Sequence, residues 1–315
     1  MKVHLISAIL VCMSLLASAS DYDIVVAQDG SGDYTTVQEA VTACGAFPTK
    51  RKVVFIKNGR YKEKVLIDTF HANLTLLGES RDKTIITFDD YSGKTPEYGT
   101  FNSYTMKVMG DDIILENLTV ENSSGEVGQA VALHAEGDKF KVVNCKLLGH
   151  QDTLYAAGKH SRQHYTNCFI AGTTDYIFGS AVAVFDNCEL HSLRNSYVTA
   201  ANTPEGNRFG YVFFQCKLTA TKDVDRVYLG RPWRDFANVV FIDCEMGAHI
   251  VPEGWHNWGQ PNREKTAFYA EYHSKGKGAA PEARVSWSHQ LTKEQASTYK
   301  LDDIYMQCES WKVAD

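Results

Sequence analysis

The hexapeptide Val142-Val143-Asn144-Cys145-Lys146-Leu147 is the first of five similar segments in this chain of 315 residues. The other four copies are Tyr165-Thr166-Asn167-Cys168-Phe169-Ile170, Phe185-Asp186-Asn187-Cys188-Glu189-Leu190, Phe213-Phe214-Gln215-Cys216-Lys217-Leu218 and Phe241-Ile242-Asp243-Cys244-Glu245-Met246. Residues 114–119 resemble an earlier copy, with Asn117 in the cysteine position. Counted from Asn117, successive copies lie 28, 23, 20, 28 and 28 residues apart. A period in the twenties indicates a solenoid.

The segments are short, apolar and alternating, which is typical of β-strands. Gly, Asn, Asp and Ser turns separate them from further short strands expected at residues 130–133, 197–199 and 227–229. Residues 52–251 show little helical periodicity. We therefore predict an all-β fold, a right-handed single-stranded parallel β-helix with strands of successive coils about 4.8 Å apart.

The recurring cysteines predict an inward-facing ladder of small buried side chains. Of eight cysteines, Cys12 lies in the N-terminal segment discussed below, and the remaining odd number leaves at least one thiol free. The alternative for two of these residues is a disulfide between Cys168 and Cys188 in place of two free thiols. No cysteine spacing is typical of a zinc site.

Both ends of a solenoid expose apolar core and need caps. The sequence Thr36-Val37-Gln38-Glu39 is a capping-box pattern, which predicts an N-terminal cap helix over residues 37–43. We expect a second helix over residues 293–299. Residues 254–287 carry few repeat features, so we expect them to pack along the side of the coils.

The N-terminus has the pattern of a secretory signal peptide. Lys2 precedes an apolar run over residues 5–16, and Ala17-Ser18-Ala19 provides a cleavage site. We therefore expect residues 1–20 to be removed and residues 21–315 to form one catalytic domain, extracellular or periplasmic. An uncleaved anchor is the alternative. No later stretch approaches the roughly 20 apolar residues of a membrane span.

The formal net charge is −6, and loss of the segment that carries Lys2 leaves −7. An acidic secreted protein is a poor partner for nucleic acid or an anionic membrane, so we expect neither. We expect a monomer. An anionic substrate would gain no long-range attraction and would need local cations.

Two acidic motifs lie one repeat apart, Gly149-His150-Gln151-Asp152-Thr153-Leu154-Tyr155 and Gly172-Thr173-Thr174-Asp175-Tyr176-Ile177-Phe178-Gly179. Asp152 and Asp175 each lie seven residues after a repeat cysteine. Counting back from the next cysteine also matches Gln129 with Asp152, at sixteen residues, and Asp175 with Arg231, at thirteen. We therefore predict that Gln129, Asp152 and Asp175 share one face of three adjacent coils, with Arg231 two coils beyond Asp175.

Two carboxylates one strand spacing apart cannot both ionise cheaply, so the pKa of one rises. Arg231 would keep Asp175 ionised as a nucleophile and leave Asp152 protonated as a general acid. The amides of Gln129 and Gln151 could stabilise an oxyanion. With no Gly-x-Ser-x-Gly motif, the set predicts acyl transfer through an aspartate. The alternative is a polar ladder that only satisfies backbone groups at coil corners.

Several aromatic side chains are candidates for stacking on sugars, namely Tyr155, Tyr176, Phe178, Trp233, Trp255 and Trp258. Trp233 and Trp255 lie in turn-like contexts, so we favour them as exposed platforms. His150 should point away from Asp152 and have a structural role. Residues 59–63 also read as a structural turn.

These motifs together resemble the pectin methylesterases, over nearly the whole chain after residue 20. The resemblance rests on Asp29-Gly30-Ser31-Gly32-Asp33-Tyr34, Gly59-Arg60-Tyr61-Lys62-Glu63, Gln129-Ala130-Val131-Ala132-Leu133, the two acidic motifs, Leu229-Gly230-Arg231-Pro232-Trp233 and Gly254-Trp255. It implies a parallel β-helix that hydrolyses methyl esters of polygalacturonate (methylesterified homogalacturonan, or pectin) without metal or cofactor.

The resemblance also implies roles for single residues. Asp175 matches the nucleophile, Asp152 the proton donor and later base, and Arg231 the residue that positions the nucleophile and binds substrate. Gln129 and Gln151 match the oxyanion-stabilising amides, and Thr100 and Trp233 match substrate contacts. His150 departs from the aromatic residue common in plant members. No inhibitory pro-domain precedes Asp21, which implies activity once the protein is secreted.

Two other classes remain open on the residues alone. A glycosidase or lyase with a β-helix would also place carboxylates in a groove, but it would cleave the glycan chain. The flanking Gln amides and Arg231 favour ester chemistry, and no acidic cluster suggests a calcium-dependent lyase. A non-catalytic carbohydrate-binding solenoid would not require the matched aspartates.

Overall fold

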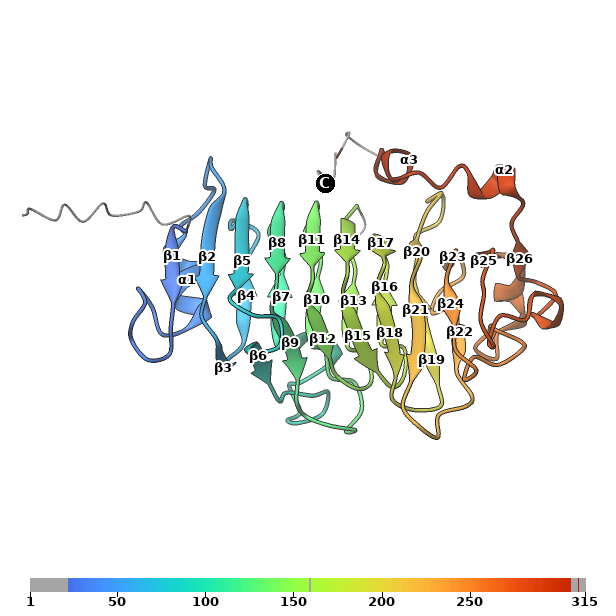
Figure 1. Ribbon diagram of the computed structural model, residues 1–315, viewed down its shortest axis with the longest axis horizontal. Helices are drawn as coiled ribbons and strands as arrows, with labels where there is room; N and C mark the ends of the chain where they lie inside the picture. The colour runs from blue at the N-terminus through green and yellow to red at the C-terminus, as the bar shows by residue number, and fades with distance from the viewer. Residues whose placement is uncertain (1–21, 159, 307–310, 312–315) are drawn as a thin grey trace, which may run out of the picture.

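The computed structural model describes residues 22–158, 160–306 and 311. Three parallel sheets run along the molecule, and the chain contributes strands to them in rotation as it coils (Figure 1). This arrangement confirms the parallel β-helix predicted from the repeat. The signal-peptide prediction falls on residues that lie outside this description.

The eleven-stranded sheet contains β1 (Ile24–Val26), β2 (Lys52–Ile56), β5 (Leu74–Gly78), β8 (Ile113–Glu116), β11 (Phe140–Val143), β14 (Arg162–Thr166), β17 (Val182–Asp186), β20 (Tyr211–Phe214), β23 (Asn238–Ile242), β25 (Phe268–Tyr272) and β26 (His289–Gln290). The eight-stranded sheet contains β3 (Gly59–Lys62), β6 (Thr84–Phe88), β9 (Thr119–Asn122), β12 (Lys146–Leu148), β15 (Phe169–Gly172), β18 (Glu189–Ser192), β21 (Lys217–Ala220) and β24 (Glu245–Met246). The seven-stranded sheet contains β4 (Val65–Ile67), β7 (Met106–Val108), β10 (Leu133–Ala135), β13 (Leu154–Ala156), β16 (Ile177–Gly179), β19 (Tyr197–Ala201) and β22 (Tyr228–Gly230).

The core consists of ladders of like side chains from successive coils. Tyr165, Phe185, Phe213 and Phe241 are register partners and fully buried, with neighbouring ring centroids 4.7, 4.5 and 4.3 Å apart. Their interplanar angles of 9–12° give a continuous stack. A strand that alternates inward and outward residues therefore repeats the same contact in each coil.

The cysteine ladder is confirmed. The five repeat cysteines are buried free thiols, namely Cys145, Cys168, Cys188, Cys216 and Cys244. The Cys168 backbone N–H donates to the Cys188 thiol at 3.4 Å, so the alternative disulfide between these two is wrong.

The residue before each cysteine makes the turn between two sheets. Asn144, Asn167 and Asn187 have φ of 50°, 55° and 52°, in the left-handed region that Asn tolerates better than most residues. Asn117 has φ of 56° and lies opposite Asn144 in the register, because Glu116 pairs with Val143. The assignment of Asn117 to the cysteine position was therefore wrong by one residue, and buried Leu118 takes that position.

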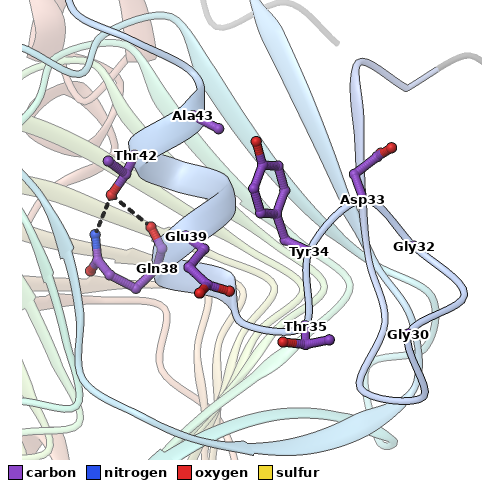
Figure 2. Close-up of a pocket in the computed structure, with 9 residues that line it drawn as sticks. All are labelled: Gly30, Gly32, Asp33, Tyr34, Thr35, Gln38, Glu39, Thr42 and Ala43. Carbon is purple, nitrogen blue, oxygen red and sulfur yellow. Dashed lines mark hydrogen bonds between the residues drawn. The ribbon is translucent and has the colours of Figure 1, made fainter.

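Helix α1 (Val37–Ala43) caps the N-terminal end as predicted. The Thr36 hydroxyl oxygen accepts from the Glu39 backbone N–H at 3.3 Å, and the Glu63 carboxylate accepts from the N–H groups of Val37 and Gln38. Glu63 is therefore a helix cap, which explains the 59–63 motif structurally. Figure 2 shows α1 facing the turn that carries Asp33 and Tyr34. Both line a hollow with a volume of about 630 Å³.

The C-terminal region differs from expectation in two ways. The helix expected over residues 293–299 ends at Ala296 (α2, Lys293–Ala296), and a separate α3 (Leu301–Tyr305) follows. Residues 254–287 do not simply pack along the side, because β25 pairs with β23 and adds another coil. The buried Arg284–Glu271 ion pair, at 2.7 Å, ties this segment down.

Ile304 and Tyr305 of α3 then pack on the outer face of the eleven-stranded sheet, against Val184 and Val240. Short 3-10 turns occur at η1 (Thr100–Asn102), η2 (Pro261–Lys265) and η3 (Pro281–Ala283). Across the described residues, no helix has the length and apolarity to cross a membrane.

Replacement of Asn144 tests the turn ladder. Its side-chain N–H donates to the Asn117 oxygen at 2.9 Å, and its oxygen accepts from Arg81 at 3.2 Å. We expect Asn144→Ala to lower the free energy of unfolding by about 2 kcal/mol, through these hydrogen bonds and the left-handed φ. Asn144→Gly keeps the backbone freedom and should cost about 1 kcal/mol less. Urea unfolding measures both, and equal losses would contradict the role of φ.

Candidate active site

The two aspartates lie on adjacent coils, as their spacing predicts. Leu154 in β13 pairs with Ile177 in β16, and Asp152 and Asp175 each lie two residues before these partners. The Asp152 backbone N–H donates to the Thr174 carbonyl at 3.0 Å. The carboxylates are therefore held side by side at the same end of the seven-stranded sheet.

Gln129 lies on the preceding coil, with a small correction to its register. It forms an isolated parallel bridge with Gln151, and the Ala130 N–H donates to the Gln151 carbonyl at 3.1 Å. The register partner of Gln129 is therefore Gln151. Counting sixteen residues back from the cysteines had matched it with Asp152 instead. The difference of one residue arises because the coils differ in length between their cysteines and their site residues.

Both aspartates have left-handed backbone conformations, with φ of 67° at Asp152 and 49° at Asp175. Asp is one of the few residues other than Gly that tolerate this region. In a regular strand neighbouring side chains point to opposite faces, yet Gln151 and Asp152 both line one pocket. The positive φ interrupts the alternation there and brings amide and carboxylate together.

This pocket has a volume of about 200 Å³. It is lined by Thr100, Phe101, Gln129, Gln151, Asp152, Asp175, Phe178, Ala200, Arg231, Trp233 and Trp258. All five residues predicted for catalysis are therefore brought together. The wall combines these polar groups with four aromatic rings and Ala200.

Arg231 forms a two-point ion pair with Asp175. Its Nε donates to Asp175 Oδ1 at 3.0 Å and its Nη2 to Oδ2 at 2.7 Å. The Arg231 side chain is 17% exposed and that of Asp175 is 7% exposed, so solvent screens the pair weakly. Arg231 therefore fixes the direction of the Asp175 carboxylate as well as its charge.

The two carboxylates differ in pKa because they differ in partners. Burial and the nearby charge of Asp175 raise the pKa of Asp152 well above its ordinary value, and Arg231 offsets this only in part. Burial also raises the pKa of Asp175, but hydrogen bonds and charge from Arg231 oppose the shift. Of the two carboxyl groups, Asp152 therefore holds a proton more readily than Asp175.

The side-chain amides of Gln129 and Gln151 form no hydrogen bond to any other group in the described part of the chain. Their N–H donors are therefore free for a ligand in the pocket. Two such donors beside a carboxylate pair can hold negative charge that develops on a carbonyl oxygen.

The six aromatic candidates have different outcomes. Phe178, Trp233 and Trp258 line the pocket, as does Thr100, the other residue expected to contact substrate. Tyr155 does not line it, but its ring packs behind the wall, 4.7 Å from Phe178 and 5.0 Å from Phe101 between centroids.

Tyr176 and Trp255 were wrong as exposed sugar contacts. Tyr176 is fully buried, with its hydroxyl 3.2 Å from the Ser192 hydroxyl. Trp255 is 1% exposed and packs against Tyr269, with ring centroids 4.4 Å apart, because it bridges Gly230 and so continues the coil inward.

Phe101 and Trp258 supply pocket walls that sequence reasoning missed or did not favour. Phe101 lies on η1 and is 47% exposed, and no motif in the sequence pointed to it. Trp258 was one of six aromatic candidates, but the turn-like context of Trp255 led us to favour that residue instead.

His150 points away from the aspartates, as expected. It lines a different hollow, with Phe169 and His191, on the far side of the 149–152 turn. Among the residues described, no group of three or more His, Cys, Asp or Glu side chains is placed to hold a metal ion.

Comparison with known proteins agrees with the resemblance found in the sequence over most of the chain. Residues 23–307 match the Pectinesterase family. The chain is 36% identical to Pectinesterase 31 of Arabidopsis thaliana, over 87% of this chain and 89% of that protein. It is 37% identical to Pectinesterase 3 of Citrus sinensis, but there it spans about half (48%) of the relative's length.

Solved structures agree in fold. A pectin methylesterase from carrot superposes with a TM-score of 0.84 at 35% identity, covering 89% of this chain and 92% of that one. A pectin methylesterase in complex with a hexasaccharide superposes with a TM-score of 0.80 at 27% identity, covering 94% and 99%. On the family match, these identities and the shared β-helix, the chain belongs to the pectinesterase family.

Proposed function

We propose that the protein is a pectin methylesterase, which hydrolyses methyl esters of methylesterified homogalacturonan to pectate and methanol. The observation that carries the proposal is the asymmetric carboxylate pair. Arg231 binds Asp175 at two points, while the Asp152 carboxyl has no hydrogen-bond partner among the described residues. Family membership and the hexasaccharide complex of a related enzyme support pectin as the substrate.

In the first half-reaction, ionised Asp175 attacks the C6 carbonyl carbon of a methylated galacturonate unit. The carbonyl oxygen becomes an oxyanion, to which Gln129 and Gln151 donate hydrogen bonds. The bond from carbon to the methoxy oxygen then breaks, and Asp152 gives its proton to the departing methanol. An acyl-aspartate remains on Asp175.

In the second half-reaction, Asp152 is a carboxylate and acts as the base. It takes one proton from water, and the hydroxide attacks the acyl carbon. The bond to Asp175 breaks, which restores the Asp175 carboxylate and leaves Asp152 protonated. The product acid ionises to a carboxylate, and repulsion from Asp175 favours its release.

The pocket walls fit the chemistry of this substrate. Phe101, Phe178, Trp233 and Trp258 surround the reacting groups with apolar surface, which suits an uncharged methyl ester and a sugar ring. Low polarity also strengthens the hydrogen bonds at the oxyanion. We assign substrate contacts to Thr100, Trp233 and Arg231 in addition to Gln129.

We also propose that residues 1–20 are a secretory signal peptide and that residues 21–315 form one catalytic domain. The apolar run over residues 5–16 and the Ala17-Ser18-Ala19 site support this. The protein would then act outside the cytoplasm as a monomer. Mass spectrometry of the secreted protein would locate its N-terminus.

Methanol release from highly methylated pectin tests the function. We expect wild-type protein to release methanol with no change in chain length, and Asp175→Asn to be slower by roughly 10⁴-fold or more. Circular dichroism should show that the variant keeps the coil. Pectin shortening would instead indicate a glycosidase or lyase, and binding without methanol would indicate a carbohydrate-binding solenoid.

Removal of the Arg231 charge should shift the pH dependence. Arg231 opposes the rise in the pKa of Asp175, so Arg231→Gln should raise that pKa further. Because Asp175 must be ionised, the acid limb of kcat against pH should move to higher pH. Arg231→Lys keeps the charge and should move it less, although it loses the two-point contact. If the acid limb of the kcat profile lay at the wild-type pH in both variants, the assigned ion pair would be contradicted.

Asp152 should reduce stability at neutral pH. The pKa of Asp152 is higher in the folded than in the unfolded protein. Its favourable contribution to the free energy of unfolding is therefore fully present below the unfolded pKa, and it is lost as the pH rises toward the folded pKa. Asp152→Asn cannot ionise and should therefore have a higher Tm than wild type at pH 7, while losing activity. The gain in Tm should shrink near pH 3, because the side chain at position 152 is then mostly uncharged in both proteins. Calorimetry at both pH values measures this, and a lower Tm at pH 7 would refute it.

A further inference from the structure

The guanidinium of Arg231 lies between two aromatic rings. Its Cζ is 4.0 Å from the ring centroid of Tyr197 and 3.6 Å from that of Trp258. We call Tyr197 and Trp258 the aromatic clamp. Two cation–π contacts restrict the plane of the guanidinium, and that plane decides whether both nitrogens reach Asp175.

The two sides of the clamp are held differently. Tyr197 begins β19 and stacks on Tyr228 at 5.4 Å, within the regular coils. Trp258 lies outside the strands, in a turn where its φ is 61°. A bulky residue in this region is strained and persists only where its surroundings hold it.

His256 connects the Trp258 turn to the coils, and Asn257 adds hydrogen bonds within the turn and to Glu264. The Trp258 backbone N–H donates to His256 Nδ1 at 2.9 Å. The backbone N–H of His256 donates to the carbonyl of Gly230 at 3.1 Å, and Gly230 directly precedes Arg231 in the chain. The imidazole also packs on the clamp, 5.5 Å from Tyr197 and 5.4 Å from Tyr228. His256 therefore connects the turn to the coil that carries Arg231, without lining the pocket itself.

We propose that His256 is a positioning residue that keeps Trp258 on Arg231, and through it Arg231 on Asp175, only while Nδ1 is unprotonated. The inference rests on the proposed role of Asp175. A proton on Nδ1 removes the acceptor for the Trp258 N–H and adds a cation beside Arg231. The clamp then opens, and the two-point contact with Asp175 loosens.

The groups that face His256 agree with a neutral imidazole near pH 7. They are the rings of Tyr197 and Tyr228 and the cation of Arg231, with the Asp175 carboxylate beyond it. Burial and the charge of Arg231 lower the pKa of His256 below its ordinary value. The clamp is therefore closed at neutral pH and lost as the solution becomes acidic.

His256→Asn is the informative substitution. An Asn side-chain oxygen can accept from the N–H two residues on, as Asn257 already does with Gly259 at 2.8 Å. This variant keeps an acceptor that does not titrate. His256→Leu keeps bulk without an acceptor, and we expect it to lower kcat roughly tenfold, the loss expected for one such hydrogen bond.

The first measurement follows tryptophan fluorescence against pH and needs no turnover. The Trp258→Phe variant provides the reference that isolates the Trp258 signal. We expect a transition below pH 6.5 in wild type that is absent in His256→Asn. Persistence of the transition in His256→Asn would overturn the proposal.

The second measurement compares pH profiles of kcat for methanol release. We expect His256→Asn to keep wild-type kcat at pH 7 and to retain more activity on the acid side. A kcat for His256→Asn as low as that of His256→Leu would also overturn the proposal. If wild type released no methanol while the fluorescence transition followed His256, the clamp would stand and the proposed function would fall.

Discussion

In-register parallel pairing between coils is the constraint on which the rest of the molecule depends. Backbone hydrogen bonds hold neighbouring coils about one strand spacing apart, so equivalent positions form ladders. The same constraint gives the aromatic stack from Tyr165 to Phe241 and the buried cysteine ladder. It also holds Asp152 and Asp175 close together, although two buried carboxylates repel each other. Side chains on a movable loop could separate, but residues fixed by strand register cannot.

That cost is what makes the pair chemically useful. Burial alone would neutralise both carboxyl groups, and a guanidinium between them would ionise both. Arg231 instead reaches from two coils away and binds one member only. In the proposed mechanism, the resulting difference in pKa separates the nucleophile from the general acid.

The positive φ at turns has two uses in the fold. At Asn144 and its counterparts it bends the chain between sheets, and the Asn side chains hydrogen-bond along the ladder. At Asp152 and Asp175 the same conformation breaks strand alternation beside the pocket. The candidate catalytic aspartates therefore lie at corners that the coil already requires, while loops outside the strands supply aromatic walls such as Phe101 and Trp258.

The sequence by itself determined the β-helix, the stacking of Asp152 on Asp175 and the reach of Arg231, because a repeat converts spacing along the chain into position in space. It also determined the N-terminal cap, since capping is a local interaction. Only the tertiary structure decided that Trp258 and not Trp255 faces the pocket, that Tyr176 is buried and that Gln129 pairs with Gln151. These outcomes depend on left-handed residues, bridges and loop contacts that shift a side chain to the other face without changing the composition of the segment.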